Sequence, residues 1–232
     1  MSRMPGVPTS LWCASSRERS VHLAVLAGAW IVHVHDWCLR VGGVGAPIVH
    51  DWLVAIVCLM RNDGFRLREW EESDAAVLLA AYAGAGMETE RPADVATVED
   101  AERLIAGWAE DAVADRAYTF AVVDGADILG QMRVTTQMRV HSIGWISYWT
   151  LEKHRGRGVG STGLKLLAKY CFDELGLFRL ETGHRLDNPG SCRVATAAGF
   201  LVEGRERQKL LYDGVRYDTE THARLATDPD PA

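Results

Sequence analysis

A glycine-rich run, Arg155-Gly156-Arg157-Gly158-Val159-Gly160-Ser161, contains the residue types and spacing in this chain that most clearly suggest chemistry. It lies between an apolar, aromatic-rich strand candidate at residues 143–151 and an amphipathic helix candidate at residues 161–175. A glycine turn that enters a helix exposes several backbone N–H groups at the positive end of the helix dipole, and such groups bind phosphate. Glycine is favoured because a Cβ would hinder positive φ angles and the close approach of a ligand. The run therefore predicts a site for a phosphate-bearing ligand.

Two common nucleotide-binding motifs fit this run less well. A P-loop needs a lysine directly after its last glycine, and none follows here. The dinucleotide fingerprint G-x-G-x-x-G is formally present as Gly158, Gly160 and Gly163, with Glu181 about 20 residues further on. That fingerprint belongs at the end of an apolar strand in a series of βαβ units, whereas a charged segment at residues 152–155 intervenes here. NAD binding remains a weaker alternative.

The elements that must position this run follow a clear order from Met60 onward. Alternation and turn residues predict strands, and 3.6-residue periodicity with capping residues predicts helices. The predicted strands are residues 65–69, 118–123, 128–140, 141–151, 178–185, 205–211 and 215–225. The predicted helices are residues 73–82, 97–108, 161–175 and 189–199. This order indicates a mixed α/β layer fold with one central crossover helix, on whose apolar face Cys171 is expected to be a core residue rather than a nucleophile.

Composition excludes several classes of function. The net charge of −6 and the pI near 5.8 argue against a nucleic-acid-binding surface. Five cysteines without a C-x-x-C pair indicate neither a disulfide framework nor a zinc site, so we expect no metal and a reducing cytoplasm. The apolar runs at residues 21–34 and 44–60 are interrupted by polar residues or proline, so we expect no membrane span.

Residues 1–59 differ in character from the rest of the chain. They contain no lysine but carry four of the eight tryptophans, four of the eight histidines and three of the five cysteines. Val34-His35-Asp36-Trp37 recurs as Val49-His50-Asp51-Trp52, a similarity that we attribute to coincidence rather than to a metal site, because two copies do not make a repeat architecture. We expect this extension to be disordered or a start-site artefact, with translation beginning at Met60.

The glycine run resembles motif A of the GNAT acetyltransferases, [QR]-x-x-G-x-[GA], which Arg155, Gly158 and Gly160 fill. The resemblance covers about residues 65–225 in the family's element order, and three stretches are similar to the RimJ/RimL-like branch: residues 65–68, 117–120 and 148–149. The later family helix is matched by Asn188-Pro189-Gly190-Ser191, Ala198-Gly199-Phe200 and Glu203-Gly204. The resemblance implies a GNAT fold over residues 60–225: a mixed, mostly antiparallel central sheet, splayed at a bulge and flanked by about four helices. Residues 226–232 are expected to be a disordered tail.

The same resemblance implies which residues bind acetyl-CoA as a cosubstrate. Backbone amides of the glycine run would hold the pyrophosphate, namely those of Gly156, Arg157, Gly158, Val159, Gly160 and Ser161. The side chains of Arg155 and Arg157 are further candidates for CoA contact. The segment at the splay, Tyr148, Trp149 and Thr150, would pair with the pantetheine arm, although the two aromatic side chains also suit a core. Asn188 would position the cofactor, cap a helix, or do both.

Catalytic roles follow from the family's reaction, in which a neutral amine attacks the thioester and a thiolate leaves. The tyrosine that many members place seven residues after the asparagine is Ala195 here, so Ser191 is the expected partner of the thiolate. Trp145 and Gly183 stand where relatives carry a basic carboxylate, and Glu181 is the substitute on the same strand face.

The acceptor is less constrained than the cosubstrate. Neutralising a lysine of pKa ~10.4 at pH 7 costs about 4–5 kcal/mol, whereas an α-amine of pKa ~8 costs only about 1 kcal/mol. A site without an obvious strong base therefore favours an N-acetyltransferase that acts on a protein or peptide N-terminal amine. A small-molecule amine, such as an antibiotic or a polyamine, is the alternative within the class. A catalytically inactive acyl-CoA-binding module is the alternative outside it. We expect a monomer or a homodimer that binds neither nucleic acid nor membrane.

Overall fold

The computed structural model describes residues 22–26, 29–34, 37–41, 61–62, 64–87 and 90–231. The chain divides into two units, Met1–Leu53 and Val54–Ala232. In the first unit, β1 (His22–Leu26), β2 (Ala29–Val34) and β3 (Trp37–Val41) form an antiparallel sheet in sequential order. The second copy of the Val-His-Asp-Trp sequence, at residues 49–52, lies outside the described residues. The interpretation of residues 1–59 as a doubtful extension stays a prediction.

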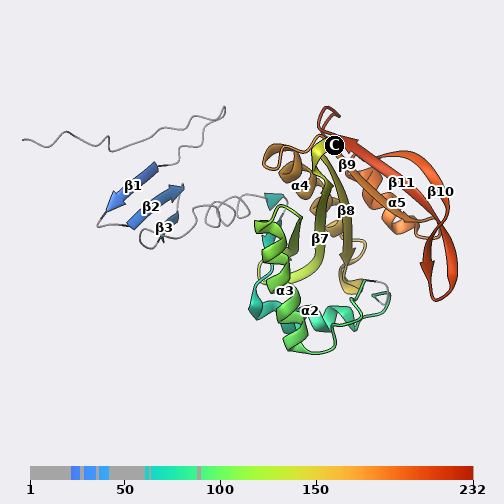
Figure 1. Cartoon of the computed structure of the whole chain (residues 1–232), viewed down its shortest axis with the longest axis horizontal. Coiled ribbons are helices and arrows are strands. Elements are labelled where there is room, and N and C mark those ends of the chain that lie inside the picture. The colour runs from blue at the N-terminus through green and yellow to red at the C-terminus, as the bar shows by residue number, and fades with distance from the viewer. Residues whose placement is uncertain are drawn as a thin grey trace, which may run out of the picture. The chain divides into compact units, whose positions relative to one another are not determined.

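The second unit is built on a sheet of eight strands in the order β10-β11-β9-β8-β7-β6-β5-β4 (Figure 1). β8 and β9 are parallel neighbours, and every other neighbouring pair in this sheet is antiparallel. The strands are β4 (Arg61–Asn62), β5 (Phe65–Glu69), β6 (Ala117–Asp124), β7 (Asp127–Met138), β8 (Ile143–Thr150), β9 (Arg179–Arg185), β10 (Leu201–Tyr212) and β11 (Val215–Leu225). The predicted mixed, mostly antiparallel sheet is confirmed.

Four α-helices accompany the sheet in the described residues: α2 (Ala75–Tyr82), α3 (Val98–Val113), α4 (Val159–Asp173) and α5 (Pro189–Ala197). Successive side chains of β8 point to opposite faces of the sheet and identify which helices cover each face. Trp149 lies in a core cluster with residues of α2 and α3, whereas Tyr148 hydrogen-bonds to α5. The α2–α3 pair and α5 therefore cover opposite faces.

The α2–α3 face contains an aromatic core. The ring centroids of Trp70 and Trp108 are 5.7 Å apart, and that of Trp149 lies 6.3 Å from Trp70 and 6.1 Å from Tyr82. Tilted pairs at such distances are favourable beyond their buried area. The prediction that the Trp149 side chain suits a core is confirmed, because only 7% of this residue is exposed.

Helix α4 packs closely against the sheet. A Cβ on Gly163 would lie 2.5 Å from Met132 Cε on β7 and 3.0 Å from Val122 Cγ2 on β6, so glycine allows this close approach without a shift of either side chain. Cys171 is fully buried, and burial raises the pKa of its thiol, so its prediction as a core residue is confirmed. The third glycine of the apparent dinucleotide fingerprint therefore serves packing.

The boundaries of some elements differ from the prediction. The capping box of α3 is confirmed: the N–H of Asp100 donates to Thr97 Oγ1 at 3.2 Å, and the N–H of Thr97 donates to Asp100 Oδ2 at 2.8 Å. Helix α3 continues through Val113, five residues past the predicted end. The prediction stopped early because the last turn buries little apolar surface, but Asp111 in this turn accepts a hydrogen bond from Arg133. Strand β10 begins at Leu201, four residues before the predicted start.

Residues 226–228 make contacts with the rest of the second unit, although residues 226–232 were expected to be a disordered tail. The N–H of Ala226 donates to the carbonyl of Phe178 at 2.8 Å, and Asp228 accepts from the N–H of Leu225 at 2.8 Å. Among the described residues no helix has both the length and the apolar character needed to cross a membrane.

Candidate functional site

The central sheet opens between β8 and β9. These strands pair over three positions only, Ile143 with Arg179, Gly144 with Leu180 and Trp145 with Glu181. Beyond Trp145, β8 continues to pair with β7, and β9 continues to pair with β11. The facing edges of β8 and β9 therefore leave the ladder while each strand keeps its outer partner. The predicted splay is present at this place.

The cause of the opening differs in detail from the prediction. Pairing of β7 with β8 is regular from Trp145 to Thr150, and the register shift lies in the segment of β7 between Thr135 and Met138. The opening is therefore a loss of pairing between β8 and β9 beyond Trp145, and the β7–β8 ladder has no bulge at residues 148–150.

Tyr148 spans the open end of the sheet. Its hydroxyl donates a hydrogen bond to the main-chain carbonyl of Ser191 in the first turn of α5, at 3.1 Å. Burial raises the pKa of the Tyr148 hydroxyl to about 12, so the hydroxyl stays protonated and remains a donor at neutral pH. Of the three predicted pantetheine contacts, Tyr148 and Thr150 are half-buried and Trp149 is buried in the opposite core.

The glycine run forms the turn that was expected from the sequence. Gly156 and Gly158 have φ angles of +76° and +79°, in the left-handed region that favours glycine. Gly158 is the N-cap of α4 and brings no capping side chain. The N–H groups in the first turn of a helix have no partner within the helix, so they are available to an anion at the turn.

The turn and the opening are neighbours. A Cβ on Gly160 would lie 3.0 Å from Val194 Cγ2 on α5 and 3.5 Å from Thr150 Oγ1 at the end of β8. Gly160 therefore occupies a narrow space between α5 and β8. The start of α4 therefore lies against the end of β8 at the opening.

Both arginines of the turn have partners within the protein. Arg155 Nε donates to the carbonyl of Thr150 at 3.3 Å. Arg157 Nη1 lies 3.0 Å from His154 Nδ1, and its Nη2 lies 3.8 Å from an Asp124 carboxylate oxygen. Burial and the nearby Lys153 and Arg157 lower the pKa of His154, so its neutral ring can accept from Arg157. A side-chain contact of either arginine with CoA stays a prediction.

Asn188 and Ser191 are joined at the start of α5. Asn188 is the N-cap, and its Oδ1 accepts the N–H of Ser191 at 3.1 Å. The capping role of Asn188 is therefore confirmed, while its contact with a ligand stays a prediction. Ser191 is half-buried beside the opening, and Ala195, one turn later, is fully buried.

Glu181 lies at the closed end of the opening, opposite Trp145 in the last paired position. Arg179 Nε donates to its carboxylate at 2.6 Å, and Arg179 Nη1 also donates to Glu203 at 2.9 Å. On β9, His184 faces α5, so alternation places Glu181 on the opposite face of the sheet. The two predicted catalytic residues, Ser191 and Glu181, therefore lie on opposite sides of the sheet at the same opening.

A second group of polar side chains was missed by sequence reasoning. Residues from three elements meet behind the first turn of α5: His184, Cys192, Glu220 and His222. The sequence carries only a weak signal for this group, the i and i+2 spacing of Glu220 and His222 in an alternating strand.

Comparisons with known proteins agree with this geometry. Residues 65–201 match the family model described as an acetyltransferase (GNAT) domain. The chain is 31% identical over 143 residues to YjcK of Bacillus subtilis, a probable N-acetyltransferase, covering 60% of this chain and 79% of that protein. It is 26% identical over 134 residues to the ribosomal-protein-serine acetyltransferase of Escherichia coli, covering 58% and 75% respectively. In fold it is similar to Mycobacterium smegmatis RimJ in complex with CoA-disulfide, with a TM-score of 0.64 and 23% identity over 70% of this chain and 82% of that one.

Proposed function

The chain belongs to the GNAT acetyltransferase family, and we propose that it acetylates the N-terminal α-amine of a protein or peptide. It is an acetyl-CoA-dependent N-acetyltransferase of the RimJ/RimL-like kind. The observation that carries the proposal is the opening between β8 and β9, whose open end lies beside the glycine turn and which has Ser191 and Glu181 on opposite sides.

The residues present fit acetyl-CoA. The amides of Gly156, Arg157, Gly158, Val159, Gly160 and Ser161 would hold its pyrophosphate at the start of α4. The unpaired edge of β8 from Tyr148 to Thr150 offers backbone N–H and C=O groups to the pantetheine arm. A backbone N–H of this edge is suited to polarise the thioester carbonyl.

Ser191 is the proposed donor to the departing thiolate. Its hydroxyl lies in the first turn of α5, whose position is set by the Asn188 cap and by the bond from Tyr148. A donor on α5 approaches the opening from the face opposite to Glu181. The amine and the leaving sulfur can therefore be served by different residues at the same time.

Glu181 is the proposed base, and its surroundings suit an α-amine. Its carboxylate forms an ion pair with Arg179 at 2.6 Å, and a carboxylate is in general a weak base. An α-amine of pKa ~8 needs little help to lose its proton at pH 7, whereas a lysine of pKa ~10.4 needs about 4–5 kcal/mol. The name of the Escherichia coli relative, which acts on a ribosomal protein, further supports a protein acceptor. A monomeric or homodimeric state and a cytoplasmic location stay predictions.

An acceptor panel with acetyl-CoA tests the proposal. It compares peptides with a free N-terminus and no lysine, the same peptides blocked at the N-terminus and carrying one lysine, and small amines of the polyamine and aminoglycoside types. We expect kcat/KM to be at least about 10-fold higher for the free N-terminus, which corresponds to about 1.4 kcal/mol in the transition state. A preference for the small amines would contradict the proposal. Acetyl-CoA binding without turnover on any acceptor would instead support an inactive binding module.

A further inference from the structure

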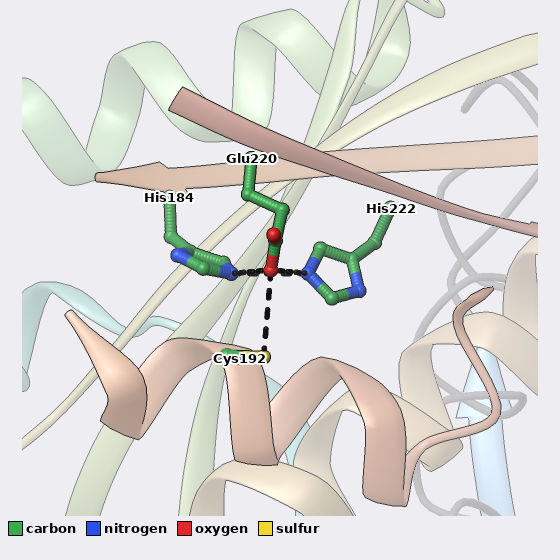
Figure 2. Close-up of side chains that lie close together, drawn as sticks. All are labelled: His184, Cys192, Glu220 and His222. Atoms are coloured by element: carbon green, nitrogen blue, oxygen red, sulfur yellow. Dashed lines mark hydrogen bonds and ion pairs between the residues drawn. The ribbon is translucent and has the colours of Figure 1, made fainter. Parts of the chain in front are cut away.

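Four side chains that can ligate a metal converge on one point between the sheet and α5. Figure 2 shows Glu220 from β11 at the centre of the group, with His184 from β9, His222 from β11 and Cys192 from α5 directed at its carboxylate. One ligand atom from each residue lies within 4.8 Å of the others. His222 and His184 are 1% and 7% exposed, and Glu220 is 8% exposed.

Strand register explains why these residues meet. His184 and Glu220 are directly paired across β9 and β11, and His222 follows two residues later on the same face. Cys192 lies in the first turns of α5, which pack over this face of the sheet. Residues far apart in sequence are thus brought to one site by regular secondary structure.

Hydrogen bonds hold part of this group together: the Nε2 atoms of His184 and His222 are within hydrogen-bond distance, but the contacts of both rings with Glu220 are long. His184 Nδ1 lies 2.8 Å from the carbonyl of Arg185, which can only accept a hydrogen bond, so Nδ1 carries a proton. In the neutral form of this ring, Nε2 then has a lone pair that can bind a metal. This Nε2 lies 3.0 Å from Nε2 of His222. Glu220 Oε1 lies 3.8 Å from the first ring nitrogen and 3.5 Å from the second, and these distances are too long for good hydrogen bonds. Cys192 Sγ is 3.6 Å from the same oxygen.

Four of the six separations between ligand atoms, at 3.0–3.8 Å, are close to those around a tetrahedral zinc ion, and the other two are within 4.8 Å. Zinc binds nitrogen at about 2.0–2.1 Å, oxygen at about 2.0–2.2 Å and thiolate sulfur at about 2.3 Å, which separates neighbouring ligand atoms by about 3.3–3.6 Å. We propose that His184, Cys192, Glu220 and His222 form a binding site for Zn²⁺. A thiolate and a carboxylate carry two negative charges, and the ion neutralises both within a buried space.

Outer contacts already orient two of the four ligands. The Nδ1–H of His184 donates to a carbonyl, an arrangement typical of histidines that bind metal through Nε2. Arg205 Nε donates to Glu220 Oε2 at 3.1 Å and leaves Oε1 directed at the site. His222 Nδ1 has no hydrogen-bond partner in the described part of the chain, so this ring lacks such an anchor.

The site would hold α5 against the sheet. Its ligands come from β9, β11 and the residue after Ser191, so a bound ion would connect the first turn of α5 to both strands. All four positions are filled by protein, which is typical of a structural zinc site rather than a catalytic one. This inference departs from the sequence-based expectation that the protein binds no metal.

Zinc titration of the full-length protein tests the site. The protein is stripped with a chelator, equilibrated with zinc and desalted, and its metal content is measured by mass spectrometry. Because residues 1–59 contain four histidines and three cysteines of their own, Cys192→Ser/His222→Gln is compared with the matched control His33→Gln/Cys38→Ser. We expect the first variant, but not the control, to lose one equivalent of zinc relative to the unaltered protein.

Two milder variants keep the test decisive where the double variant fails to fold. Arg205 is an exposed side chain, and Arg205→Ala should raise the Kd for zinc by about 10–100-fold, whereas Arg207→Ala should not. In the cobalt-substituted protein, a thiolate-to-metal charge-transfer band should be present and should disappear in Cys192→Ser. Equal zinc content in the unaltered protein and in Cys192→Ser/His222→Gln would overturn the proposal, as would a cobalt spectrum that Cys192→Ser leaves unchanged.

Discussion

The hydroxyl of Tyr148 and the main-chain carbonyl of Ser191 form a 3.1 Å hydrogen bond across the open end of the central sheet. The bond joins β8, whose edge is proposed to bind pantetheine, to α5, which carries the proposed thiolate donor. The geometry of the reaction site therefore depends on a contact between two elements that do not pair along their backbones.

Tyr148→Phe should weaken this connection with little change to the fold. Loss of one hydrogen bond should lower the free energy of unfolding by about 1 kcal/mol, and the Kd for acetyl-CoA should rise several-fold because α5 is held less firmly. Calorimetric titration with acetyl-CoA and urea unfolding measure the two effects. Tyr118→Phe is the control, because its hydroxyl bonds to Asp115 away from the opening. An equal loss of affinity in both variants would contradict the role of Tyr148.

Ser191→Ala should lower kcat by about 100-fold, because a positioned proton donor contributes rate in that range. The Kd for acetyl-CoA should change little, since the Ser191 N–H that Asn188 caps is retained. Steady-state kinetics and equilibrium binding separate these effects. Ser73→Ala is the control, because Ser73 is an exposed serine to which the proposal gives no role. If kcat survives unaltered in Ser191→Ala, the serine is not the thiolate donor.

Gly158→Ala should impair both stability and cofactor binding. An alanine at φ +79° costs about 1–2 kcal/mol, and relaxation of the strain would move the amides at the start of α4. Gly214→Ala is a matched control, since Gly214 has a φ of +78° and a Cβ there meets nothing within 4 Å. We expect similar losses of stability in urea unfolding, with a fall in acetyl-CoA affinity confined to Gly158→Ala.

Glu181→Gln should lower kcat for a peptide N-terminus by about 10-fold at pH 7, at the lower end of general-base effects. The deficit should shrink toward pH 9, because an α-amine of pKa ~8 is then mostly neutral without help. A pH–rate profile of both proteins measures this change. Glu203→Gln is the control, since Glu203 shares Arg179 but is not the proposed base. A deficit that is constant with pH would argue for a structural role instead.

Asp74→Asn should destabilise the protein at pH 7 by about 2 kcal/mol, because Asp74 accepts two charged hydrogen bonds from Arg68, at 2.5 and 2.9 Å. Burial alone would raise the pKa of Asp74, but the Arg68 guanidinium and the Glu71 N–H hold it below its ordinary value. A lowered native pKa gives stability that is present above about pH 4 and is lost as the pH falls through the native value. The difference between Asp74→Asn and the unaltered protein in urea unfolding should therefore disappear in acid. Asp173→Asn, which alters an exposed pair with Lys169, should change stability little at either pH.

Local sequence signals were sufficient to predict most helices and strands of the second unit, Val54–Ala232. Alternation located β5, and the Asp124-Gly125 turn located the β6–β7 hairpin. The Thr97–Asp100 capping box fixed the start of α3. The turn at Gly156 and Gly158 was predictable because its chemistry is local: positive φ angles followed by a helix start. Each of these features depends on residues within a few positions of one another.

Features that depend on distant residues were not predictable. The group formed by His184, Cys192, Glu220 and His222 depends on the register of β9 against β11 and on how α5 packs over both. The end of α3 was misplaced because its last turn is held by Asp111 bonding to Arg133, 22 residues away in sequence. Glu181 was chosen from its strand face alone, and its ion pair with Arg179 emerged only from the fold.

The parting of β8 from β9 gives this protein a sheet edge in its interior. The unpaired N–H and C=O groups of an exposed sheet edge can pair with a strand of another chain, which is a common route to aggregation. Here the Tyr148–Ser191 bond crosses the open end and holds α5 over one face of the edge, which hinders addition of a strand from another chain. We expect the pantetheine arm, an extended chain with two amide groups, to pair with this edge. Binding of the cosubstrate along this edge would then supply the partner that β9 does not provide, so the proposed site would also cover an edge that could otherwise add a foreign strand.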